Sequence, residues 1–98
     1  MIVRIVKMQF REDEVQNFKK VFDASKEKIR AFPGILHLEL LQDRKDQCTL
    51  FTYSQWESEE DLEKYRNSAL FKNTWAQTKP LFSAAAQAWS TDIKHRLA

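Results

Sequence analysis

Four sets of side chains in this sequence could take part in chemistry: His37, Tyr53, Tyr65, and the pair Trp56 and Trp75. Histidine and tyrosine can exchange a proton with a substrate, and indole rings can form the walls of a site for a flat aromatic molecule. Each also has a simpler interpretation. A lone histidine beside Glu39 on the polar side of a strand is more often a surface or interface residue than a base, and aromatic residues usually serve core packing.

Other common catalytic arrangements cannot be written in this sequence. Gly34 is the only glycine, which excludes glycine-rich phosphate loops and the nucleophile elbow. Cys48 is the only cysteine, and no histidine stands at a suggestive spacing from it. Two histidines and one cysteine cannot complete a four-ligand zinc site without a carboxylate. We therefore expect neither a metal nor a cofactor.

Length and composition favour one domain covering residues 1–98. Hydrophobic residues make up 43% of the chain, which is enough for a core, and the charged 31% is of mixed sign with a net charge of +2. No run of like charges marks a nucleic-acid binder, and no apolar run is long enough to span a membrane. A single unpaired cysteine and the lack of a signal peptide lead us to expect a cytoplasmic protein.

The first half of the chain predicts a strand, a helix and a second strand. Residues 1–10 alternate, which places Val6, Met8 and Phe10 on one face. A helix is predicted from the acidic residues 12–14 to about residue 31, with Asp13 as its cap and Gln16 as the reciprocal partner. Residues 35–42 form the next strand. Its Leu36, Leu38 and Leu40 are expected on one side, opposite His37, Glu39 and Leu41.

The second half of the chain predicts a strand, a helix in two pieces and a final strand. Residues 48–57 are rich in Thr, Phe, Tyr and Trp, which favours a strand antiparallel to the preceding one. Ser58 caps the following helix, Asn67-Ser68 interrupts it, and residues 70–75 restart it. Pro80 predicts a break near Lys79. Residues 86–94 are predicted to form the last strand.

This order is the βαββαβ plan of an α+β, ferredoxin-like fold: an antiparallel sheet with helices on one face. The opposite face carries Val3, Ile5, Phe51 and Tyr53, which is too apolar a set to be left in water. We therefore expect a second copy of the chain to cover it, which predicts a homodimer.

Several candidate site residues belong to the second helical region or to the corner that leads into it. Tyr65 is expected to point inward and Arg66 in another direction. Trp56 is expected to fill the corner between strand and helix, with its indole N–H bonded to a nearby carbonyl. Phe71 and Trp75 are one helical turn apart. The residues alone indicate a cleft lined by aromatic and apolar side chains.

The segment FTYSQWESEEDLEKYRNSALFKNTW, which follows a Pro-Gly and two strands, resembles the antibiotic biosynthesis monooxygenase domain. Its pattern of Tyr53, Trp56 and Ser58, followed by Leu62, Ser68 and Phe71, carries the resemblance, and the element order extends it over nearly the whole chain. The resemblance implies a dimeric α+β barrel. The superfamily includes cofactor-independent oxygenases acting on phenols and quinols, haem-degrading enzymes, isomerases and members with no known reaction.

Individual positions depart from the patterns of that superfamily. Quinol-oxygenase-like members carry Tyr-Glu-x-Trp in the third strand; here Tyr53 and Trp56 match, but Ser54 takes the place of the glutamate. Those members tend to have a histidine in the second helix, where this chain has Tyr65. The Asn, Trp and His triad of the haem-degrading branch falls on Val6, Tyr65 and Trp75, so the axial histidine is missing.

The leading hypothesis is a cofactor-independent monooxygenase that oxidises a small aromatic phenol or quinol with O2. Under this hypothesis Tyr65, His37 and Tyr53 are the candidate catalytic residues. The expected substrate-binding residues are Trp56, Arg66, Phe71, Trp75 and Met8. The alternative is a non-catalytic dimeric binding module for an apolar metabolite, or for haem held through His37 or Tyr65.

Overall fold

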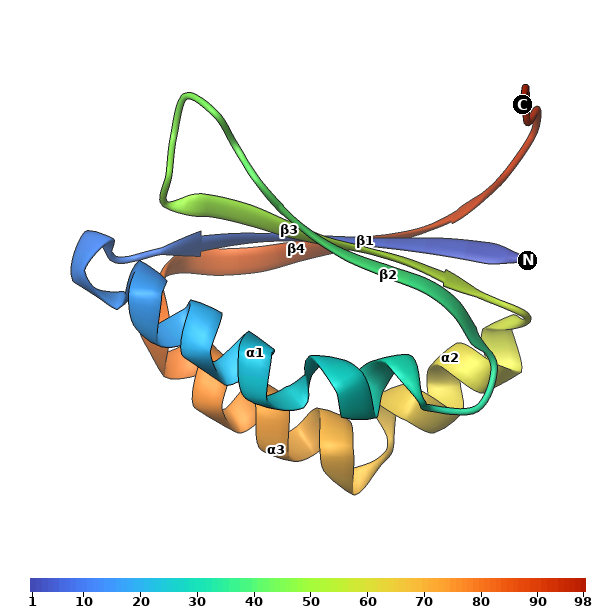
Figure 1. Cartoon of the computed structure of the whole chain (residues 1–98), viewed down its shortest axis with the longest axis horizontal. Coiled ribbons are helices and arrows are strands. Elements are labelled where there is room, and N and C mark those ends of the chain that lie inside the picture. The colour runs from blue at the N-terminus through green and yellow to red at the C-terminus, as the bar shows by residue number, and fades with distance from the viewer.

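A computed structural model describes all 98 residues and confirms the predicted α+β order. Four strands form one antiparallel sheet in the order β2-β3-β1-β4, and all helices lie on one side of it (Figure 1). The strands are β1 (Ile2–Phe10), β2 (Ile35–Gln42), β3 (Thr49–Trp56) and β4 (Phe82–Asp92). The α-helices are α1 (Val15–Arg30), α2 (Glu59–Arg66) and α3 (Ala69–Thr78), with short 3-10 turns at Glu12–Glu14 and Lys79–Leu81.

The start of α1 differs from the prediction. The acidic residues form a separate 3-10 turn, and the helix begins at Val15 with no side chain capping it. The predicted pairing of Asp13 with Gln16 is therefore wrong. Three acidic side chains still lie at the amino end of the helix, where negative charge is favourable even without a capping hydrogen bond.

The two pieces of the second helical region are confirmed, and each begins at a serine. The Ser58 hydroxyl accepts a hydrogen bond from the Asp61 amide at 3.2 Å, and the Ser68 hydroxyl accepts one from the Phe71 amide at 3.1 Å. Ser68 therefore caps α3 directly after the break between the helices. α3 extends to Thr78, beyond the predicted residue 75.

Two strand details were not predicted. β4 begins at Phe82, four residues earlier than expected, because its alanine-rich start pairs with the end of β1 through an irregular register. In β2, a register shift between Ile35 and His37 buries Ile35 and leaves Leu36 40% exposed. The prediction that Leu36 shares the inner face with Leu38 is therefore wrong.

The core between the sheet and the helices consists of two clusters. The first surrounds Phe10 and Leu50 and the second surrounds Trp56 and Leu62, and each of these four side chains is buried. Packing the helices against a single sheet face leaves space between the two clusters, and the candidate site lies there.

The other sheet face has no helix over it. The register aligns Ile5 with Tyr53 on one side and Trp89 on the other, so these side chains share the face opposite the helices. We call this surface, formed by Ile5, Phe51, Tyr53, Trp89 and their neighbours, the open face. In Figure 1 the segment after β4 rises on this side of the sheet. None of the helices is long and apolar enough to cross a membrane.

Candidate active site

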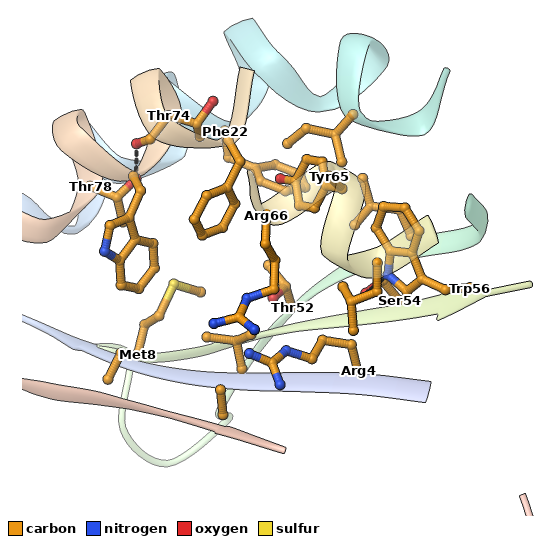
Figure 2. A pocket seen from close by; sticks show the side chains of 18 of the residues that line it. Arg4, Met8, Phe22, Thr52, Ser54, Trp56, Tyr65, Arg66, Thr74 and Thr78 are labelled. Carbon is orange, nitrogen blue, oxygen red and sulfur yellow. Dashed lines mark hydrogen bonds between the residues drawn. The ribbon is translucent and has the colours of Figure 1, made fainter. Parts of the chain in front are cut away.

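A cavity of about 330 Å³ lies between the sheet and the helices. Strands β1 and β3 form its floor, with β4 at one edge, and side chains of α1, α2 and α3 form its roof (Figure 2). Of its 19 lining residues, 13 are hydrophobic. Its volume is at the small end of the range for ligand sites, which suits one compact, flat molecule.

Six of the eight residues predicted for the site line this cavity. They are Met8, Trp56, Tyr65, Arg66, Phe71 and Trp75. His37 and Tyr53 do not line it. Their rings contact each other edge-on, with centroids 6.1 Å apart, on the open face. The sheet therefore separates these two candidates from the other six.

The Tyr65 ring is held by aromatic neighbours on several sides. It stacks on Trp56 at a centroid distance of 5.1 Å and meets Phe32 and Phe71 edge-on at 5.4 and 5.3 Å. This burial raises the pKa of Tyr65 to about 12, because the tyrosinate loses hydration. At neutral pH the side chain is a neutral phenol, which can donate a hydrogen bond or a proton but cannot serve as the base.

Trp56 lines the cavity and also donates a hydrogen bond to another cavity residue. Its side chain is only 1% exposed, and its indole Nε1 donates to the Ser54 hydroxyl at 3.0 Å. The burial of Trp56 confirms its predicted place at the corner between strand and helix. The predicted hydrogen-bond acceptor was a carbonyl, and this part of the prediction is wrong because the acceptor is a hydroxyl. The Ser54 hydroxyl accepts this hydrogen bond, so it is already engaged with Trp56. No Asp, Glu or His lines the cavity.

Several cavity residues were missed by the sequence analysis. Thr74 and Thr78 face it from α3, and each hydroxyl donates to a backbone carbonyl of the preceding turn at 2.8 Å. Arg4 lines the floor. The alternation that places Val6 and Met8 on the inner face of β1 also places Arg4 there, so the signal was present in the sequence.

Two guanidinium groups give the cavity its charge. Arg66 was expected to point away from Tyr65, but both residues line the cavity, and Figure 2 shows the Arg66 side chain reaching toward Arg4. Burial lowers the pKa of Arg4, and the nearby positive charge of Arg66 lowers it further. Glu63 opposes this shift. Arginine nevertheless stays cationic at neutral pH.

The pocket has few side chains that could bind a metal ion or haem iron. No group of three or more His, Cys, Asp and Glu side chains is placed to hold a metal ion. Of the two residues considered as haem ligands, His37 lies on the open face and only Tyr65 reaches the cavity. A tyrosine binds iron as tyrosinate, and the raised pKa of Tyr65 works against that form.

Fold and site together define a small ferredoxin-like protein with an enclosed, aromatic-lined pocket. A model of the antibiotic biosynthesis monooxygenase family matches residues 1–77, and the chain belongs to that family. A comparison with curated proteins finds no significant match.

Solved structures with the same fold are distant in sequence. An antibiotic biosynthesis monooxygenase superposes with a TM-score of 0.89 at 16% identity, covering 95% of this chain and 98% of its own. A conserved protein from Methanosarcina mazei Go1 gives 0.90 at 19% identity, with 96% and 94% covered. A mutant of SnoaB, a cofactor-independent oxygenase from Streptomyces nogalater, gives 0.87 at 12% identity, with 98% and 95% covered. At these identities the similarity establishes the fold.

Proposed function

We propose that this protein is a cofactor-independent monooxygenase that oxidises a small phenol or quinol with O2. The observation that carries the proposal is the enclosed aromatic pocket, which contains a neutral tyrosine hydroxyl and two cations but no carboxylate or histidine. Family membership supports the oxygenase class, and SnoaB, which shares the fold, is described as a cofactor-independent oxygenase.

The chemistry requires an electron-rich substrate. O2 reacts slowly with closed-shell organic molecules, but a phenolate can supply electrons to it. In the simplest balanced reaction, a phenol and O2 give a quinone and water. One oxygen atom forms a new C=O bond at a ring carbon, and the other leaves as water with the hydroxyl proton and the proton from that carbon. The substrate supplies all four electrons.

The pocket residues have distinct roles in this reaction. The net positive charge of Arg4 and Arg66 favours the phenolate over the neutral phenol without a direct contact to its oxygen, and this effect persists when one of the two charges is paired with another anionic group of the substrate. The phenol proton can therefore leave to solvent without a base in the pocket. Tyr65 is protonated when the substrate binds and gives its proton to the outer oxygen of the ring-bound peroxide as the O–O bond breaks. The tyrosinate formed in this step, and not the resting phenol, then takes the proton of the ring carbon. Trp56, Phe71 and Trp75 hold the ring and exclude water.

The proposal is tested by oxygen uptake of the purified protein with a panel of hydroquinones and polycyclic phenols. We expect uptake that requires the protein and yields a product containing one atom from labelled O2. Tyr65→Phe should lower turnover at least about tenfold, and Trp75→Ala should raise KM. Tyr53→Phe, on the open face, is the matched control and should change turnover less than about twofold.

Other outcomes of the same assay contradict the oxygenase proposal. Thermal stabilisation by these compounds without any uptake would indicate a binding module instead. Uptake that is unchanged in Tyr65→Phe would remove Tyr65 from the mechanism.

We also propose that the chain acts as a homodimer, with a second copy covering the open face. The support is the exposed apolar surface there: Leu41 and Trp89 are exposed, and Ile5 and Tyr53 lie beside Trp89 without a helix above them. The sheet lies between His37 and the pocket of the same chain. His37 and the other residues of the open face therefore act in association and not in catalysis.

A further inference from the structure

The two arginines of the pocket form an unusual pair for a cavity that is otherwise apolar. Arg4 comes from the middle of the sheet and Arg66 from the last turn of α2, yet their guanidinium groups lie next to each other (Figure 2). Their mutual repulsion contributes to the lowered pKa of Arg4. Like charges placed together at a partly buried site are unfavourable unless an anion lies between them.

The protein itself neutralises this pair only in part. Arg66 forms one ion pair, Nη1 to Glu63 Oε1 at 2.9 Å, and both side chains are about half exposed there. Arg4 has no carboxylate partner, and its Nη1 donates to the Ser90 hydroxyl at 3.0 Å. Since each guanidinium has five N–H donors, most of those on Arg4 and Arg66 remain available to a ligand.

The position of the pair also suits a ligand that enters from solvent. Among the residues that line the cavity, Arg66 and Ala88 are exposed, whereas Phe18, Trp56 and Leu62 are buried. The cations therefore mark the mouth, and the apolar walls mark the interior. Tyr65 lies on the helix side of the pocket (Figure 2). A ligand can therefore make polar contacts at two places: with the Tyr65 hydroxyl beside the apolar interior, and with Arg4 and Arg66 at the entrance.

From this geometry we infer that the substrate is an aromatic acid whose carboxylate binds between Arg4 and Arg66. The ring then occupies the apolar interior, and a ring oxygen reaches the Tyr65 hydroxyl. A carboxylate matches the planar fork of a guanidinium and can accept from both arginines at once. The inference rests on the proposed function in one respect: the same pocket must be the ligand site.

The strongest competing explanation is that Glu63 already satisfies the pair. Glu63 is a single carboxylate facing two guanidinium groups, and it contacts Arg66 from within the same helix, three residues away. An exposed pair of that kind is weak. A ligand carboxylate that also reaches the partly buried Arg4 would displace Glu63 from Arg66. Substitution of Glu63 therefore tests the inference.

The test measures binding in the absence of O2, using quenching of the tryptophan fluorescence from the pocket. The probes are 6-hydroxy-2-naphthoate and its neutral amide, which share one ring system. We expect the acid to bind wild type at least about tenfold more tightly than the amide. Arg4→Gln and Arg66→Gln should each reduce that preference to below about threefold without weakening the amide, whereas Arg44→Gln, on the exposed β2–β3 loop, should leave it unchanged.

Glu63→Gln provides a gain-of-binding test that does not depend on a fragile variant, because the residue is exposed. Removing the competing carboxylate should tighten the acid about threefold or more and leave the amide unchanged. Equal affinity for acid and amide in wild type, a full preference retained in Arg4→Gln, or no binding of either probe would overturn the inference.

Failure of this inference is distinguishable from failure of the oxygenase proposal. Preferential binding of the acid without any oxygen uptake from acidic or neutral phenols would leave the arginine site standing and remove the oxygenase function. Oxidation of neutral phenols by a protein that does not prefer the acid would do the opposite.

Discussion

The two faces of the sheet carry similar side chains in different surroundings. The inner face presents Trp56 and Met8 to the helices, and with Tyr65 of α2 they line the pocket. The open face presents Tyr53, His37 and Trp89 without any helix above them. Both faces therefore hold aromatic rings and groups that could transfer a proton.

The difference between the faces lies in enclosure. Tyr65 loses its hydration to three aromatic neighbours, which raises its pKa to about 12. His37 Nε2 lies 3.2 Å from Glu39 Oε1, and both side chains are about half exposed. Water on the open face weakens such electrostatic interactions, whereas the pocket strengthens them. Residue types alone could not assign the chemistry to one face.

The largest expected effect of this difference is on stability. Trp56→Ala should lower the free energy of unfolding by about 3–5 kcal/mol, because the side chain is 1% exposed and holds a second core cluster together. Trp89→Ala, the matched change on the open face, should cost less than half of that in the monomeric chain, where the residue is 46% exposed. Urea unfolding of both variants at a protein concentration at which the chain is monomeric provides the comparison. Equal losses would mean that the two faces are equally enclosed.

A second prediction concerns the open face directly. Ile5→Glu places a charge at its centre, between Tyr53 and Trp89, and should weaken self-association at least about a hundredfold. Sedimentation equilibrium measures the change. Lys20→Glu, on an exposed position of α1, is the charge control and should leave association unchanged. A wild-type protein that remains monomeric at high concentration would contradict the proposed homodimer.

The third prediction uses the titration of Tyr65. The folded protein keeps its phenol proton up to about pH 12, whereas the unfolded chain loses it near pH 10. Between these values the folded state binds more protons, so this residue's contribution to stability is lost as the pH rises. We expect the wild type to lose on the order of 1 kcal/mol per pH unit more than Tyr65→Phe over this window. Urea unfolding at several alkaline pH values measures the slope; parallel slopes would mean that Tyr65 is not enclosed.

Most of the fold could be predicted because local signals agreed with the tertiary structure. Period-two alternation in residues 1–10, the Ser58 cap and the break at Asn67-Ser68 each act within a few residues, and each is found in the structure. The errors have long-range causes. The bulge that exposes Leu36 arises from the pairing of β2 with β3, and the early start of β4 arises from its pairing with β1.

The candidate site was harder to predict because side chains reach beyond the face of their own element. Arg66 was assigned a different direction from Tyr65 on the basis of helical spacing, but its long side chain extends to the pocket. Arg4 interrupts the apolar run of residues 1–10 and was not among the predicted site residues, although it lines the pocket. Its partner lies 62 positions away, and no spacing rule connects the two arginines.

The smallest expected effect is the sharpest test of the separation between faces. His37→Gln removes the only histidine considered as a catalytic base and leaves the pocket untouched, because the sheet lies between them. The lost contact with Glu39 is exposed, so stability should change by less than about 1 kcal/mol. Turnover of a phenol should stay within about twofold of wild type across pH 6–8, measured by oxygen uptake. A tenfold loss, or the disappearance of a pH dependence in that range, would bring the open face into the chemistry, and the second copy of a dimer would then have to carry His37 to a substrate.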